Sequence, residues 1–255
     1  VLAGETFDIY PMDAGQPVYL IHAMPQAWMR PRLWQSLGRL VLKSESDQTL
    51  TGLTTSGTGT GNRVVGGNAS ISALTLDIIG NTTNIYTGFL GGAGANENNL
   101  ALNKAGDGIL ALTSANTYTG RTTVTGGVLA VDADNRLGGD PGSLITNQLT
   151  LDGGTFAAIA TFGMNPNRGV TLGSGGGTIW VDPTRFLTNV GGIYGAGGLT
   201  KTGNGVLILK TNSQYAGDTV VAGGVLRLDA ANALPGGIAA TGGVARPNGR
   251  IPSDS

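Results

Sequence analysis

Two segments of this chain repeat each other 97 residues apart, at about residues 99–137 and 196–234, and they agree mainly at every second position. Alternate residues of a β-strand point to opposite faces, so a match with a period of two indicates strands that have kept one face. The kept face is the one expected to be buried. The matched positions are Leu102, Lys104, Gly106, Gly108, Leu110, Leu112, Tyr118, Gly120, Thr122, Val124, Gly127 and Leu129 in the first copy, and Leu199, Lys201, Gly203, Gly205, Leu207, Leu209, Tyr215, Gly217, Thr219, Val221, Gly224 and Leu226 in the second.

The composition is typical of a turn-rich β protein. Glycine contributes 45 of the 255 residues, and 40% of the residues are hydrophobic, which is enough to form a core. The 15 basic and 16 acidic residues nearly cancel, and the β-rich region has no basic stripe, so nucleic acid is not an expected partner. No cysteine is present, which excludes disulfides and thiolate metal sites.

Short alternating segments separated by turn residues predict strands from residue 49 to residue 236. The expected strands cover 74–77, 109–113, 128–132, 149–152, 169–172, 178–182, 206–210 and 225–229. Duplicated strands of this kind favour a β-solenoid, in which each coil stacks on the one before, over a β-sandwich, which stays open as an alternative. At about 20 to 25 residues per coil, the solenoid would be a rod roughly 40 Å long.

The two ends of the chain differ from this region. Residues 1–48 are expected to be an irregular segment that caps the solenoid, with a short helix over 31–43 that begins at Pro31. A membrane-surface helix is the alternative for 31–43, but no run is apolar and long enough for a direct membrane span. Residues 237–255 lose the alternation and are expected to form a flexible tail.

The duplicated segment resembles the autotransporter-associated β-strand repeat, also called the passenger-associated transport repeat. The family pattern G-L-x-K-x-G-x-G-x-L-x-L followed by N-x-Y-x-G-x-T-x-V-x-x-G-x-L is matched in both copies. The first copy has Asn116 but lacks the leading glycine, and the second has Gly198 but carries Ser213 in place of asparagine.

This resemblance implies a right-handed parallel β-helix within the passenger of a bacterial surface protein. It also implies a secreted or cell-surface location in a Gram-negative-type bacterium. The implied partner is a C-terminal translocator barrel in the parent protein, and a host or surface glycan is a further candidate partner.

The sequence has few of the residues that catalysis needs. His22 is the sole histidine and lies in an apolar run, so we interpret it as structural. Neither a G-x-S-x-G elbow nor a phosphate-binding loop occurs. Asp132 and Asp229 end equivalent strands and are interpreted as residues that bond turn amides. We therefore expect no enzyme activity, no cofactor and no metal, and we interpret the glycine-rich segment 91–96 as a loop rather than a calcium site.

The remaining motif residues have structural and functional interpretations. Lys104 and Lys201 could contact a ligand, but an edge charge or a stacked-turn residue is the favoured interpretation. Tyr118 and Tyr215 are interpreted as packing residues rather than sugar platforms.

The sequence therefore predicts a structural β-helical passenger segment that supports export and display and contributes to adhesion. One alternative is a carbohydrate-active β-helix enzyme, which would need several carboxylates on one face. Another is a sugar- or ice-binding solenoid with outward threonine arrays such as Thr58 and Thr60 or Thr122 and Thr123.

Overall fold

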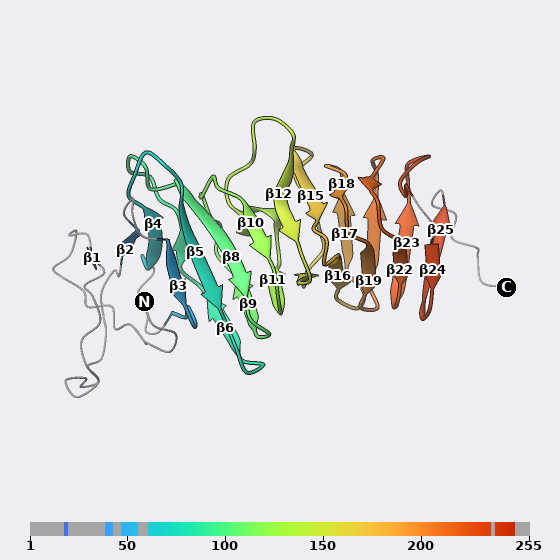
Figure 1. Ribbon diagram of the computed structural model, residues 1–255, viewed down its shortest axis with the longest axis horizontal. Coiled ribbons are helices and arrows are strands. Elements are labelled where there is room, and N and C mark those ends of the chain that lie inside the picture. Colours follow the sequence, from blue (N-terminus) through green and yellow to red (C-terminus); the bar gives the residue numbers. More distant parts are fainter. Residues whose placement is uncertain (1–17, 20–38, 43–46, 56–60, 236–237, 248–255) are drawn as a thin grey trace.

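The computed structural model describes residues 18–19, 39–42, 47–55, 61–235 and 238–247. Within these residues every paired strand is parallel, and the strands stack side by side into one elongated solenoid (Figure 1). Glycine and asparagine at the turns, with β-branched and leucine residues between them, produce these short strands. The β-solenoid expected from the duplication is confirmed, and a sandwich is excluded.

The described strands form four sheets, which we name A to D. Sheet A contains β1 (Val18–Tyr19), β2 (Arg39–Leu42), β4 (Arg63–Gly66) and β7 (Phe89–Leu90). Sheet B contains β3 (Gln48–Leu50), β5 (Ser72–Asp77), β8 (Leu100–Ala105), β10 (Thr122–Val124), β12 (Ile145–Leu151), β15 (Arg168–Leu172), β18 (Ile193–Gly195) and β21 (Gln214–Tyr215).

Sheet C contains β6 (Thr83–Tyr86), β9 (Ile109–Leu112), β11 (Val128–Val131), β13 (Thr155–Ala158), β16 (Gly177–Val181), β19 (Leu199–Thr202), β22 (Thr219–Val221) and β24 (Ile238–Ala240). Sheet D contains β14 (Phe162–Gly163), β17 (Phe186–Asn189), β20 (Val206–Leu209), β23 (Gly224–Leu228) and β25 (Gly243–Pro247). One 3-10 helix, η2 (Asp134–Leu137), follows β11. From β12 to β23 the chain passes through sheets B, C and D in turn, so each of these coils has three sides.

Alternate side chains of these strands fill one continuous interior. Leu110, Leu112, Leu207 and Leu209 are all at most 1% exposed, as the retained face of the repeat predicts. They belong to a single apolar cluster that extends from Leu50 to Ala233. Each of these leucines stacks between inward residues of the coils before and after it, so the core is built one coil at a time.

The coils differ in length. Along sheet B the stacked partners are separated by 28, 20, 27, 21 and 23 residues, through Leu74, Leu102, Thr122, Leu149, Val170 and Ile193. As a result the two repeat copies lie on different faces. Strands β8 and β9 of the first copy belong to sheets B and C, whereas β19 and β20 of the second belong to sheets C and D.

The ends of the solenoid differ from the sequence-based boundaries. Arg39–Leu42 forms strand β2 rather than the end of a helix, because it pairs with β4 in the first sheet. The rest of the expected helix lies outside the described residues, as do His22 and the greater part of segment 1–48. The flexible tail expected over 237–255 is wrong for the part that the structure describes, because β24 and β25 continue sheets C and D there.

Candidate functional site: the lysine corners and the arginine clasp

Both repeat copies place a lysine at the corner between two faces of the solenoid. In each copy the lysine points inward from its strand and is 0% exposed. Lys104 lies at the end of β8, just before the turn to β9, and Lys201 holds the same position between β19 and β20. The interpretation of Lys104 and Lys201 as edge charges is therefore wrong. Both lysines lie within stacked turns, which was the other structural interpretation.

Each buried ammonium is surrounded by backbone carbonyl oxygens. Lys104 Nζ donates to the carbonyls of Ala105, Gly106 at 3.1 Å and Gly126 at 3.3 Å. Lys201 Nζ donates to the corresponding carbonyls of Thr202, Gly203 at 2.8 Å and Gly223 at 3.1 Å. Two of the three acceptors lie in the lysine's own turn and the third lies in the turn of the next coil. One ammonium thus joins two stacked corners.

Burial sets the electrostatics of these corners. Desolvation lowers the pKa of Lys201 from 10.5 to about 8. Desolvation also lowers the pKa of Lys104, although the charges of Asp77 and Asp107 oppose this shift. A buried ammonium needs its full set of hydrogen bonds, which the three carbonyls supply.

The motif glycines make room for these corners. Gly106 and Gly203 adopt φ of 69° and 70°, a left-handed conformation that glycine reaches without steric cost. Gly108 and Gly205 follow in the same turns, and Gly127 and Gly224 of the next coil lie against the backbone of these turns. A side chain at Gly205 would meet the Asp182 carbonyl at 2.2 Å, so the corner closes only with glycine there.

The tyrosine of each copy packs inside the coil that follows the lysine corner. The Tyr118 hydroxyl lies 2.6 Å from that of Thr122, and Tyr215 and Thr219 form the same pair. Burial raises the pKa of Tyr118 to about 12 and also raises that of Tyr215. The packing interpretation of the tyrosines therefore agrees with their burial.

The other motif positions take equivalent places in the two copies. Thr122 is buried, so it does not belong to an outward threonine array, and Thr58 and Thr60 lie outside the described residues. The leucines and valines of the motif fill the core, namely Leu102, Val124, Leu129, Leu199, Val221 and Leu226. Gly120 and Gly217 lie against the backbone of the preceding coil.

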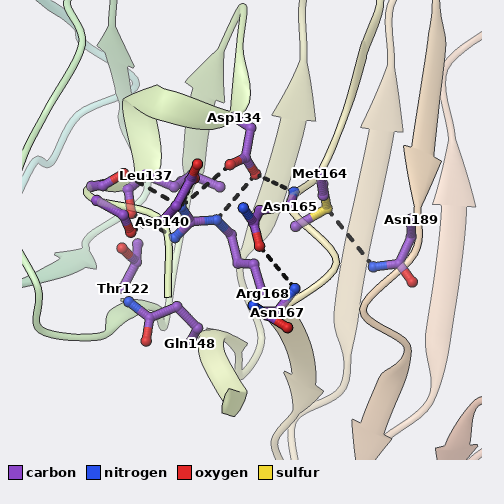
Figure 2. Close-up of polar contacts among 12 residues, drawn as sticks. Thr122, Asp134, Leu137, Asp140, Gln148, Met164, Asn165, Asn167, Arg168 and Asn189 are labelled. Atoms are coloured by element: carbon purple, nitrogen blue, oxygen red, sulfur yellow. Dashed lines mark hydrogen bonds and ion pairs between the residues drawn. The ribbon is translucent and has the colours of Figure 1, made fainter. Parts of the chain in front are cut away.

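A third buried cation, Arg168, was not found from the sequence. Its side chain is 0% exposed, and its Nε donates to Asp134 Oδ1 at 3.0 Å while Nη2 reaches Asp134 Oδ2 at 3.3 Å (Figure 2). The carbonyls of Leu137, Gly138 and Gly139 accept its remaining bonds at 2.8, 3.3 and 3.3 Å. We call this group the arginine clasp.

The arginine clasp holds the segment between η2 and β12 against the next coil. Asp134 also accepts a bond from the Asn165 backbone amide at 3.1 Å, and Asp140 lies 3.7 Å from Arg168 Nη2. The Asn167 side chain donates to the Pro141 carbonyl at 2.9 Å. One sequence feature agrees with the arginine clasp. Asp134 is replaced by Ala231 in the second copy, so the clasp is specific to the first copy.

The aspartates at the strand ends pair with arginines instead of bonding turn amides. Asp132 accepts from Arg136 Nε at 2.6 Å, and Asp229 accepts from Arg227 at 2.8 and 2.9 Å. Among the described residues no group of three or more histidines, cysteines or carboxylates could hold a metal ion. No helix of the described part of the chain is long and apolar enough to cross a membrane.

Comparison with known proteins agrees with this geometry. The family model described as the passenger-associated-transport-repeat matches residues 102–131 and 199–228, the two segments that contain the lysine corners. No solved structure matches the chain.

A curated relative is the adhesin BmaC autotransporter of Brucella suis biovar 1 (strain 1330). It is 42% identical to this chain over 129 residues, which is 50% of this chain and 4% of the adhesin. Both matches agree with the expected location outside the cell or on the surface of a Gram-negative bacterium. The chain is therefore a β-solenoid that contains two passenger-associated transport repeats and is similar over half of its length to a short part of an autotransporter adhesin.

Proposed function

We propose that this chain is a structural segment that supports export and surface display of a longer passenger, and that it has no catalytic role of its own. The observation that carries this proposal is the lysine corner. Lys104 obtains its third acceptor, Gly126, from a turn 22 residues further along the chain. A coil therefore completes its buried hydrogen bonds only after the next coil has stacked.

This dependence suits a chain that folds as it emerges from a membrane. Each coil contacts only its neighbours, so folding can proceed one coil at a time. Stacking the next coil buries a further row of leucines and completes the previous corner, and both effects oppose backward sliding. The partner in this process is the C-terminal translocator barrel of the parent protein.

Export can be tested with a passenger made of residues 1–255 between an export leader and a translocator barrel. The double variant Lys104→Met and Lys201→Met keeps the aliphatic stems but removes both ammonium groups. We expect a surface yield reduced by about fivefold or more and faster digestion by external protease. Lys210→Met, at an exposed lysine, is the matched control. Normal yield and protease resistance for the double variant would count against the proposal.

We extend this proposal to a role in adhesion, because the relative BmaC is itself an adhesin. Purified residues 1–255 should adhere to cultured host cells in a saturable manner. Binding equal to that of an unrelated β-solenoid would limit the chain to its scaffold role.

Binding of a sugar or of ice is a second candidate function, favoured by one observation. Half-buried threonines stack on the outer face of sheet B at Thr75, Thr123, Thr150 and Thr171, with Asn103 between the first two. Retention on insoluble polysaccharide or on ice, lost in Thr123→Val with Thr150→Val, would support this function. Equal retention of the variant and the wild type would exclude this row.

A further inference from the structure

The turn of the second lysine corner contains Asn204 followed by Gly205, the one Asn-Gly pair among the residues that the structure describes. Asn204 is exposed, and Gly205 is buried. Asparagine is a chemically labile residue, and a glycine after it leaves its side chain the most freedom to reach the next backbone nitrogen, because glycine has no Cβ. Asn204 is therefore a candidate site of covalent change.

The change that this pair undergoes is deamidation through a five-membered ring. The Gly205 nitrogen loses its proton to a base in the solvent and attacks Asn204 Cγ. A C–N bond forms, the Cγ–Nδ2 bond breaks, and Nδ2 leaves as ammonia. Water then opens the ring at one of its two carbonyl groups. One opening gives aspartate, and the other gives isoaspartate, in which the main chain runs through the side-chain carbons and is one atom longer.

The neighbouring coils oppose the first step of this reaction. Gly205 N donates its proton to the Val181 carbonyl of the previous coil at 3.1 Å, and the Gly205 carbonyl accepts from Val225 N of the next coil at 3.2 Å. A Cβ at Gly205 would lie 2.2 Å from the Asp182 carbonyl oxygen, so the backbone at this point is closely covered. Attack on Asn204 therefore requires that the corner first open locally.

The first repeat shows that aspartate fits a closed corner. Asp107 holds the position that Asn204 has in the second repeat, and it is also exposed. The next residue, Gly108, donates to the Ile78 carbonyl at 2.7 Å, as Gly205 donates to Val181. The aspartate product of deamidation is therefore compatible with the corner.

The isoaspartate product does not fit. Lys201 Nζ donates to the carbonyl of Gly203 at 2.8 Å, one residue before Asn204, and Gly205 N is bonded to Val181 one residue after it. A main chain that is one atom longer between Gly203 and Gly205 moves one of these two groups out of place. The chain then loses either an acceptor of the buried ammonium or the hydrogen bond to the previous coil.

We infer that Asn204 is a deamidation site that the stacked coils keep closed, and that isoaspartate formed there before folding prevents the second lysine corner from closing. The modified fraction grows with the time that a chain spends unfolded. This protection belongs to the fold, so it holds whether or not the chain supports export.

Incubation of the folded and the unfolded chain in mildly alkaline buffer tests the protection. Residues 1–255 are kept folded or in guanidinium chloride, and mass spectrometry of the tryptic peptide 202–210 follows the aspartate and isoaspartate forms. We expect Asn204 to deamidate at least about tenfold more slowly in the folded chain. In guanidinium chloride it should deamidate about as fast as Asn248, the other asparagine that precedes a glycine.

Refolding of the incubated chain tests the consequence. The chain is transferred to the urea concentration at which half of the unmodified molecules are folded, and it is digested briefly with thermolysin. The surviving chains should contain about fivefold less isoaspartate at 204 than the starting mixture, whereas the aspartate form should survive as well as asparagine does.

Two variants supply the controls. Asn204→Asp should keep the urea midpoint of the wild type, and Asn204→Gln should stop the reaction at 204 while Asn248 continues to deamidate. Equal rates of deamidation at Asn204 in the folded and unfolded chain would overturn the protection, as would an Asn204 that stays unchanged in guanidinium chloride. Isoaspartate that survives digestion as well as asparagine would overturn its effect on the corner.

Discussion

The ammonium of Lys201 donates a hydrogen bond to the carbonyl oxygen of Gly223, 3.1 Å away and 22 residues further along the chain. Lys104 and Gly126 form the same contact in the first repeat at 3.3 Å. A position that resembles a surface lysine in the sequence is therefore a buried link between neighbouring coils.

Removal of the Lys201 ammonium should destabilise the solenoid. Lys201→Met leaves three carbonyl oxygens without their donor, so we expect a loss of about 2 to 4 kcal/mol in the free energy of unfolding. Urea unfolding followed by circular dichroism measures the change. Lys210→Met, at an exposed site, should change stability by less than about 0.5 kcal/mol. Equal midpoints for the two variants would show that the carbonyl contacts contribute little.

Stability should also depend on the protonation of Lys201. Its pKa is lowered to about 8 in the folded chain, from an ordinary value of 10.5. Between these values the unfolded chain binds more protons than the folded chain, so this group makes the free energy of unfolding rise with pH. The buried tyrosines act oppositely above about pH 10, because burial raises their pKa values.

The pH dependence that Lys201 contributes can be separated from that of the tyrosines by comparing the wild type with Lys201→Met. Between about pH 8 and 9.5, the stability of the wild type minus that of Lys201→Met should increase by at most about 1.4 kcal/mol per pH unit. A difference that does not change with pH would mean that Lys201 keeps its ordinary pKa in the folded protein.

Ser213 is a site where the second repeat can be improved. Its hydroxyl is buried and has no hydrogen-bond partner. In the first repeat Asn116 occupies this position, where its Oδ1 accepts from Leu90 N at 2.8 Å and its Nδ2 donates to Arg136 O at 2.7 Å. Ser213→Asn should therefore stabilise the chain by about 1 kcal/mol.

The reverse change at Asn116 gives the matched control. Asn116→Ser should destabilise the chain by about 1 to 3 kcal/mol, because it leaves two backbone groups unpaired. Thermal melting of both variants provides the comparison. A loss of stability in Ser213→Asn would mean that the second repeat cannot accommodate the larger side chain.

Arg168 should contribute through Asp134 and through the carbonyls that it binds. Arg168→Leu leaves three carbonyls without their donor and leaves the partly buried Asp134 carboxylate with only the Asn165 amide, so we expect a loss of about 3 to 5 kcal/mol. A double-mutant cycle with Asp134→Ala should give a coupling energy of about 1 kcal/mol or more. Asp132→Ala breaks a more exposed pair and should cost less than about 1 kcal/mol. Additive losses at Arg168 and Asp134 would contradict the arginine clasp.

Much of the fold follows from local pattern. The period of two at Leu110, Leu112, Leu207 and Leu209 predicts which side chains are buried, and all four are inside. The paired glycines before Val128 and Val225 predict turns, because a left-handed backbone at a corner requires glycine. These features depend on a few consecutive residues, so the sequence is sufficient to find them.

The polar interior was not predictable in the same way. The strand period places Lys104 on the retained face, but the acceptor that completes its hydrogen bonds, Gly126, lies 22 residues further along the chain. The carbonyl acceptors of Arg168 lie about 30 residues away. Charged residues are expected at the surface unless partners are known, and here the partners are backbone carbonyls, which every residue carries. The one sequence feature that pointed to the arginine clasp is the replacement of Asp134 by Ala231 at the equivalent position of the second copy.

The sequence alone determined that this chain is a β-solenoid with two transport repeats, because strand period and turn chemistry are local properties. The tertiary structure decided which face each repeat occupies. Coils of 20 to 28 residues rotate the second copy by one face, from sheets B and C to sheets C and D. It also decided that both lysines are buried, since a lysine can leave water only where the next coil brings a carbonyl oxygen to its ammonium.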